Sequence, residues 1–186
     1  MSATILPEKT LHYPVLLNEV INIITPQNGG TFIDCTFGQG GYSKKILENS
    51  ENKVIALDRD KEVLNQALSL KKKFGSKFNF YNLKFSEIIS LSPKTDNLKG
   101  IIFDLGYSLN QINDLNRGIS FKSKSKLNMK MGMNDFSAED VINNLNQESL
   151  AKIIKSFGEE QKAKLIAKNI IQQRSKKNIL THDLVS

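Results

Sequence analysis

Apolar residues along the first half of the chain fall into short runs that alternate with longer amphipathic segments. Short apolar, β-branched runs predict buried strands, and apolar residues at helical spacing predict helices. We expect a parallel sheet of about four strands with helices on both faces, which defines an α/β fold. The expected strands are 29–38, 53–58, 78–86 and 98–106, and the expected helices are 12–26, 41–50 and 59–74.

The pattern changes after Gly106, and this change predicts two parts, residues 1–106 and 107–186. Residues 107–134 are polar, rich in lysine and aperiodic. Ser137 and Asp140 have the spacing of a capping box and predict a helix start.

The segment 148–174 predicts two helices. Gly158 is expected to cap the first, and Glu159 and Glu160 suit the first turn of the second. In the first part, Pro14 is expected in the opening turn of helix 12–26 and Pro26 at its stop. Thr181 is expected as the N-cap of a final short helix.

Composition narrows the class of protein. The chain has 186 residues, a net charge of +7, an isoelectric point near 9.4 and a mean hydropathy of −0.32. The positive surplus favours a polyanionic partner such as nucleic acid, although a lysine-rich surface would give the same total. We expect Cys35 and His12 to be packing residues, no metal site, and a cytoplasmic protein without export signal or membrane span.

The stretch "DCTFGQGGYS", residues 34–43, is the strongest candidate for a ligand-binding loop. A strand, a glycine-rich turn, a helix and an acid after the second strand form the nucleotide-cofactor arrangement, in which Asp58 would bind ribose hydroxyls. Asp60 is better explained as a helix N-cap. Ser43 stands where a dinucleotide fingerprint has Gly or Ala, which favours S-adenosylmethionine over a pyrophosphate cofactor. A purely structural turn is the alternative.

Two further features are candidates for chemistry. Asp104 lies at the carboxyl end of the fourth expected strand, the edge where ligands bind, although an Asp close before Gly also forms turns. The segment 117–134 contains five basic residues and no acid, and is either a phosphate-binding or a solvated flexible loop. Part of it is expected to fold back through its apolar residues, which are Phe121, Leu127, Met129, Met131 and Met133.

Several segments together resemble the bacterial-type small-subunit (16S) ribosomal RNA cytosine-N4 methyltransferases. The matching motifs run in the order "HYPVLLNEV", "DCTFGQGGYS", "ALDRD", "FDLGYSLNQI", "RGISF", "LNMKM" and "FGEEQKAKLIAKNI". This resemblance implies a Rossmann-like class I methyltransferase sheet in residues 1–106 and a helical, substrate-recognising insertion in 107–186.

The resemblance also implies an activity, which is methyl transfer from S-adenosylmethionine to the N4 amine of a cytidine. It implies a cofactor pocket containing Gly40, Gly41, Tyr42, Asp58, Phe85, Asp104 and Gln111. Asp104 is the candidate catalytic residue, because a carboxylate can hold the amine. Arg117, Lys122 and Lys130 would grip RNA phosphates of the small subunit.

The chain departs from the family pattern in several places. Tyr42 stands where the family usually has His, Leu109 and Asn110 replace Ser and Pro, and Asn128 and Lys130 replace Asp and Arg. Family members continue with further strands, so we expect a fragment of such an enzyme, with an uncovered flank on strand four and dimerisation as one outcome. The alternatives are a non-catalytic RNA-binding module or inactive truncated paralogue, and a nicotinamide-dependent oxidoreductase.

Overall fold

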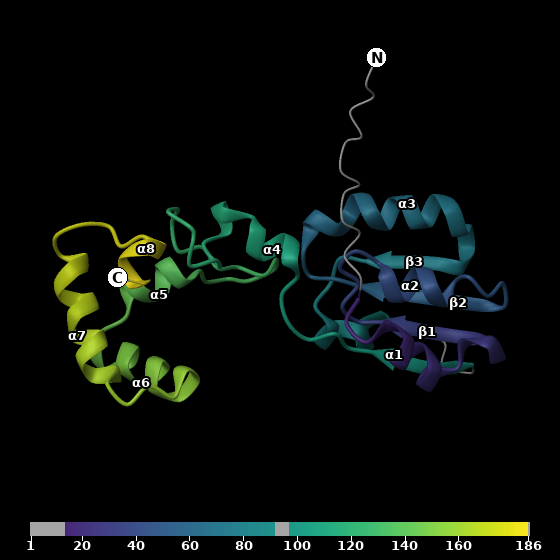
Figure 1. Ribbon diagram of the computed structural model, residues 1–186, viewed down its shortest axis with the longest axis horizontal. Coiled ribbons are helices and arrows are strands. Elements are labelled where there is room, and N and C mark those ends of the chain that lie inside the picture. The colour runs from purple at the N-terminus through teal and green to yellow at the C-terminus, as the bar shows by residue number, and fades with distance from the viewer. Residues whose placement is uncertain (1–13, 92–96, 186) are drawn as a thin grey trace, which may run out of the picture. The chain divides into compact units, whose positions relative to one another are not determined.

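The computed structural model describes residues 14–91 and 97–185, which form two compact units, 1–106 and 107–186 (Figure 1). His12 and the beginning of the expected helix 12–26 lie outside the described residues. The functional roles expected of the two units stay predictions.

The first unit is built on a parallel sheet, as the sequence predicts. Its four strands stand in the order β3-β2-β1-β4, with Phe32 paired to Val54 on one side and to Gly100 on the other. The third and fourth strands end earlier than expected, because a 3-10 helix and an irregular loop replace their last residues. The bounds are β1 Gly30–Asp34, β2 Asn52–Leu57, β3 Phe78–Tyr81 and β4 Leu98–Ile102.

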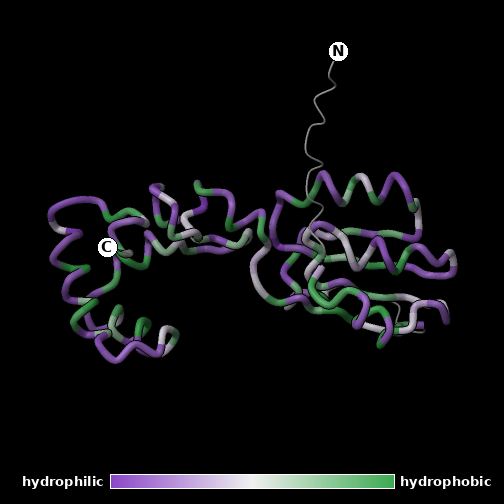
Figure 2. The backbone as a smooth tube through the Cα atoms, viewed as in Figure 1, coloured by the Kyte–Doolittle hydropathy of each residue, from purple (hydrophilic) through white to green (hydrophobic). Residues whose placement is uncertain are grey.

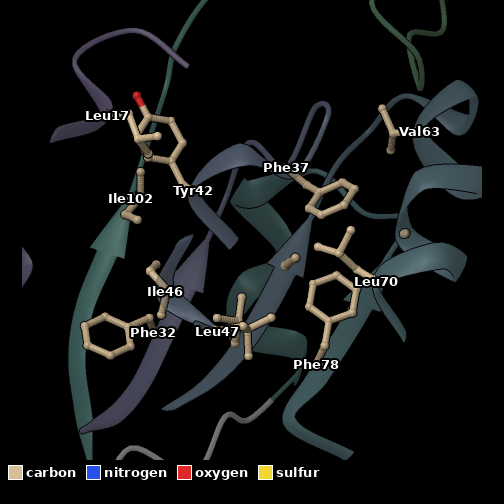
Figure 3. Packing of buried hydrophobic residues seen from close by; sticks show 13 residues of the cluster. Leu17, Phe32, Phe37, Tyr42, Ile46, Leu47, Val63, Leu70, Phe78 and Ile102 are labelled. Atoms are coloured by element: carbon tan, nitrogen blue, oxygen red, sulfur yellow. The ribbon is translucent and has the colours of Figure 1, made fainter. Parts of the chain in front are cut away.

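Three α-helices pack on the same face of this sheet. These helices are α1 Leu17–Ile24, α2 Gly41–Ile46 and α3 Leu64–Phe74. Figure 3 shows their apolar side chains meeting those of the strands, with Leu70 beside Phe78. In this cluster Phe32, Ile46 and Phe78 are completely buried, so this face holds the main core.

The opposite face carries a helix as expected, but one of 3-10 type and not an α-helix. Within the described residues it is covered only by a 3-10 helix, η4 Phe85–Leu91, against Ile33 and Leu57. Ile101 and Phe103 remain 45% and 50% exposed there. This second face is therefore buried over β1 and β2, where η4 covers Ile33 and Leu57, and open to solvent at Ile101 and Phe103.

The start of the first helix also differs from expectation. Pro14 precedes α1 instead of lying in its first turn, because Leu16 takes a left-handed conformation with φ of 52° and the helix begins at Leu17. Pro26 does follow the end of α1 and opens a 3-10 helix, η1 Pro26–Asn28. Asp60 caps the short helix η2 Lys61–Val63 through the Glu62 N–H, as predicted.

The second unit is helical. Its elements are α4 Leu109–Asn113, η5 Leu115–Arg117, α5 Ala138–Asn144, α6 Gln147–Gly158, α7 Ala163–Arg174 and α8 Thr181–Val185. Figure 2 shows apolar segments alternating with polar ones along these helices, as expected for helices that bury one side. Leu127, inside the basic segment, is buried with Leu150 and Ala167. This part of the segment folds back as predicted, whereas Phe121 is 82% exposed.

Helix termini in this unit confirm one prediction and correct another. Ser137 and Asp140 form the predicted capping box at the start of α5. Gly158 is the last helical residue of α6, and Glu159 is the left-handed cap, with φ of 52°. Glu159 and Glu160 therefore lie in the connection before α7, which begins at Ala163.

Candidate cofactor site at the carboxyl edge of the sheet

Three aspartates meet the carboxyl edge of the sheet. Asp34 ends β1, Asp58 follows β2 directly, and Asp104 lies two residues after β4. Because β1, β2 and β4 are parallel and β1 lies between the other two, the three aspartates lie at the same edge of the sheet. The sequence predicted this gathering for Asp58 and Asp104.

The glycines of the loop between β1 and α2 have distinct structural roles. Gly38 and Gly40 have φ of 51° and 75°, a region that favours glycine. A Cβ on Gly40 would come within 2.7 Å of the Phe37 ring, and a Cβ on Gly41 would overlap Pro14. A Cβ on Gly38 would approach only the Thr36 carbonyl, at 3.9 Å. Packing thus requires Gly40 and Gly41, while Gly38 borders open space.

Two N–H groups of this loop already have acceptors within the protein. Gly38 donates to Oδ2 of Asp58 at 2.7 Å, and Gly40 donates to the carbonyl of Phe37 at 2.7 Å. A pyrophosphate needs free loop N–H donors. The N–H groups of Gly38 and Gly40 are therefore not free to bind a phosphate in this structure.

Asp58 is held from both sides. Its Oδ2 accepts from Gly38, its Oδ1 accepts from the Asp60 N–H at 2.8 Å, and its own carbonyl accepts from the Asn82 amide. Burial raises the pKa of this carboxyl, while the backbone donors oppose the shift. Each carboxylate oxygen has a second lone pair, so Asp58 can still accept from ligand hydroxyls.

Asp34 was missed as a site residue by the sequence reasoning. It is completely buried, and its carboxylate accepts from the Ser43 hydroxyl at 2.7 Å and the Thr36 N–H at 3.3 Å. Burial raises its pKa to about 6, against the lowering effect of these bonds. The carboxylate therefore ties the two ends of the glycine loop together, and Ser43 has a structural reason to be serine. The sequence signal that could have predicted this bond is an acid and a hydroxyl residue at the two ends of the glycine loop.

The side chain of Tyr42 is part of the core. It is 5% exposed, and its hydroxyl donates to the Val15 carbonyl. Figure 3 shows the ring beside Leu17 and Ile102. Burial raises the pKa of this phenol to about 12, with a further contribution from Asp104. Its expected place in the cofactor pocket stays a prediction.

Asp104 is anchored through its backbone. Its N–H donates to Oγ1 of Thr36 at 2.7 Å, and its half-buried carboxylate has no hydrogen-bond partner within residues 14–91 and 97–185. Next to it, Phe103 meets Phe85 edge to face, with ring centroids 5.5 Å apart. Phe85 is 41% exposed, so part of its ring can receive a flat group.

Gln111 belongs to the second unit and caps α4. Its side-chain oxygen accepts from the Ser108 N–H at 2.9 Å, and its own N–H donates to the Ser108 hydroxyl at 3.3 Å. Its expected place in the cofactor pocket stays a prediction.

The predicted phosphate-binding residues differ in their surroundings. Arg117 lies 3.5 Å from Asp114 with only 11% of its side chain exposed, whereas Lys122 is exposed. Lys130 borders a polar pocket of about 350 Å³. The pocket is lined by Asn116, Ser125, Lys126, Asn128, Lys130, Ser137 and Glu139. Lys122 is therefore available to a ligand from solvent, whereas Lys130 is half-buried with its ammonium 3.5 Å from the Asp135 carbonyl, and Arg117 is largely engaged.

The family model of the MraW methylase family matches residues 9–186. This chain belongs to that family. The match covers both units, including the glycine loop and the basic segment.

Relatives carry a more specific name. The chain is 43% identical to the ribosomal RNA small subunit methyltransferase H of Orientia tsutsugamushi (strain Ikeda), over 92% of this chain and 55% of that protein. It is 39% identical to the proteins of the same name from Rickettsia akari and Ehrlichia canis, over 90% and 92% of this chain and 55% and 59% of theirs. The chain thus spans about half the length of these relatives.

Among residues 14–91 and 97–185, no helix has the length and apolar character that crossing a membrane requires. The same residues contain no group of three or more His, Cys, Asp or Glu placed to hold a metal ion. Cys35 is a buried free thiol beside Ile33 and Leu57, and burial raises its pKa to about 11.

Proposed function

We propose that this chain binds S-adenosylmethionine at the glycine loop and provides the cofactor-binding part of a small-subunit ribosomal RNA (cytosine-N4) methyltransferase of the cytoplasm. The observation that carries the proposal is the set of three aspartates around this loop, together with loop N–H groups that already have acceptors. S-adenosylmethionine bears a sulfonium and an ammonium group. An acidic edge attracts such a ligand and repels a pyrophosphate.

The individual residues fit this cofactor. Asp58 has lone pairs directed away from its backbone donors and would accept from the two ribose hydroxyls. The exposed part of the Phe85 ring would pack against the adenine. Gly38 borders open space, which lets a ligand approach the backbone closely. Membership of a methylase family supports the same assignment.

The chemistry assigned to the protein is positioning and charge stabilisation. When bound, the cofactor supplies an electrophilic methyl group, so that a C–S bond breaks, an N4–C bond forms and the amine loses one proton. The Asp104 carboxylate, free of hydrogen-bond partners among the described residues, would accept N–H bonds from the cytosine amine and take that proton. Holding the amine in place lowers the entropic part of the barrier.

The proposed substrate is small-subunit ribosomal RNA or the 30S particle. Lys122 and Lys130 would bind phosphates, and most of the positive surplus of the chain lies in residues 107–186. A cytosine stacked in RNA cannot reach the sheet edge, so the target base must leave its stack. The names of the relatives support this substrate class.

Calorimetric titration of the chain with S-adenosylmethionine, S-adenosylhomocysteine and NAD tests the cofactor assignment. We expect the first two to bind and NAD not to bind. Asp58→Ala should weaken binding by about 1–3 kcal/mol, because a buried hydrogen bond is lost. Asp60→Asn is the matched control, since it removes one charge two residues away while asparagine still caps η2.

Two other binding results would support a different function. Binding of NAD alone would replace the methyltransferase assignment with an oxidoreductase. Binding of none of the three, together with salt-dependent binding of 16S ribosomal RNA, would leave a non-catalytic RNA-binding module.

A further inference from the structure

The β1–β4 ladder ends before it reaches Asp104. Asp34 pairs with Ile102 in this ladder, and the Cys35 N–H donates to the Ile102 carbonyl at 2.9 Å. The next contact across the two chain segments is made by a side chain. Oγ1 of Thr36 accepts from the Asp104 N–H at 2.7 Å.

Thr36 also belongs to the network of the buried acid. Its own N–H donates to the Asp34 carboxylate at 3.3 Å, and that carboxylate accepts from Ser43 at 2.7 Å. One residue after Thr36, the Phe37 N–H donates to the Leu57 carbonyl at 2.9 Å. Thr36 is therefore held on the β1 side by backbone bonds while its hydroxyl reaches towards β4.

We propose that Thr36 is a positioning residue, whose hydroxyl fixes the backbone of Asp104 and thereby directs the Asp104 carboxylate into the cofactor and substrate site. This inference rests on the proposed function for its consequence, but the hydrogen bond itself is a property of the free chain. Asp104 lies outside β4, two residues after its last residue, Ile102, and its N–H is bonded to the Thr36 hydroxyl instead of to the neighbouring strand. A small misplacement of a reacting group costs much of its effect.

Two substitutions separate the hydroxyl from the shape of the side chain. Thr36→Val keeps the branched shape and removes the acceptor, whereas Thr36→Ser keeps the acceptor. Amide hydrogen exchange in the cofactor-free chain measures directly whether the Asp104 N–H is hydrogen-bonded to Thr36. We expect the Asp104 N–H to lose protection in Thr36→Val by about tenfold or more, and to keep it in Thr36→Ser.

Asp104 is also an expected member of the cofactor pocket, so calorimetry with S-adenosylmethionine measures the consequence of its misplacement. Thr36→Val should bind about tenfold more weakly than the wild-type chain, and Thr36→Ser should bind nearly as tightly. In an Asp104→Asn background the Thr36→Val change should have no further effect, because Thr36 acts through that carboxylate. Thermal unfolding of each variant confirms that it is folded.

The outcomes are distinguishable. Equal exchange of the Asp104 amide in wild type and Thr36→Val, or equal cofactor affinity, overturns the positioning role while the proposed function stands. An additive effect of Thr36→Val on the Asp104→Asn background also overturns it. A wild-type chain that fails to bind S-adenosylmethionine overturns the proposed function, and with it the role of Thr36 in that site.

Discussion

The buried carboxyl of Asp34 makes the stability of the first unit depend on pH. Its pKa is about 6 in the folded chain, against an ordinary value of 3.8, because burial disfavours the charged form. Below pH 3.8 both the folded and the unfolded chain hold the proton. Between the two values the unfolded chain loses it first, so stability falls as the pH rises, and above pH 6 the loss is complete.

The magnitude follows from the shift. About two pH units, at about 1.4 kcal/mol each, correspond to a loss of about 3 kcal/mol from the free energy of unfolding. Asp34 is completely buried, so solvent screening does not reduce this figure. The pKa of Asp58 shifts in the same direction, and Asp58 is present in both wild type and the variant Asp34→Asn.

The variant Asp34→Asn removes the titrating group and keeps the shape. Its amide can still accept from the Thr36 N–H and bond Ser43. Urea unfolding followed by circular dichroism from pH 4 to pH 7 should show a stability loss about 2 kcal/mol larger in wild type than in Asp34→Asn, because a small part of the full loss falls below pH 4. Asp135→Asn, at an exposed position of the second unit, controls for removing one charge. Parallel pH profiles for wild type and Asp34→Asn would refute the reasoning.

Three further changes test the packing. Phe32→Ala should lower the free energy of unfolding by about 3–5 kcal/mol, because the ring is completely buried, whereas Ile101→Ala at a half-exposed position should cost about 1 kcal/mol or less. Equal losses in urea melts would contradict this difference in burial. Gly40→Ala should lower the melting temperature, because φ at this position is positive and a Cβ would come within 2.7 Å of the Phe37 ring. An unchanged melting temperature would argue against that contact. Ser137→Ala should lower the free energy of unfolding by about 0.5–2 kcal/mol, because the cap of α5 is lost. Unchanged amide hydrogen exchange in the first turn of α5 would show that the cap is dispensable.

Local patterns were enough for several features. The alternation of apolar runs predicted four parallel strands, and the spacing of Ser137 and Asp140 predicted a cap. The acid that follows β2 and the glycine loop before α2 were also readable, because strand ends and turns depend on neighbouring residues. Helix ends were less predictable. The α6 cap fell on Glu159 and not on Gly158, since the exact end of a helix depends on how the next segment leaves it.

Tertiary structure decided what the residues do. Thr36 and Asp104 are 68 positions apart, and only the pairing of β1 with β4 brings the hydroxyl to the N–H. The packing of α2 likewise decides that Ser43 is hydrogen-bonded to Asp34 and that Tyr42 is buried in the core. All three helices lie on one face, a choice that periodicity leaves open because it shows that a strand is buried but not from which side. The sequence by itself determined the elements and the acids at their ends, and packing across the sheet decided which of those acids is buried, which is anchored and which is left to meet a ligand.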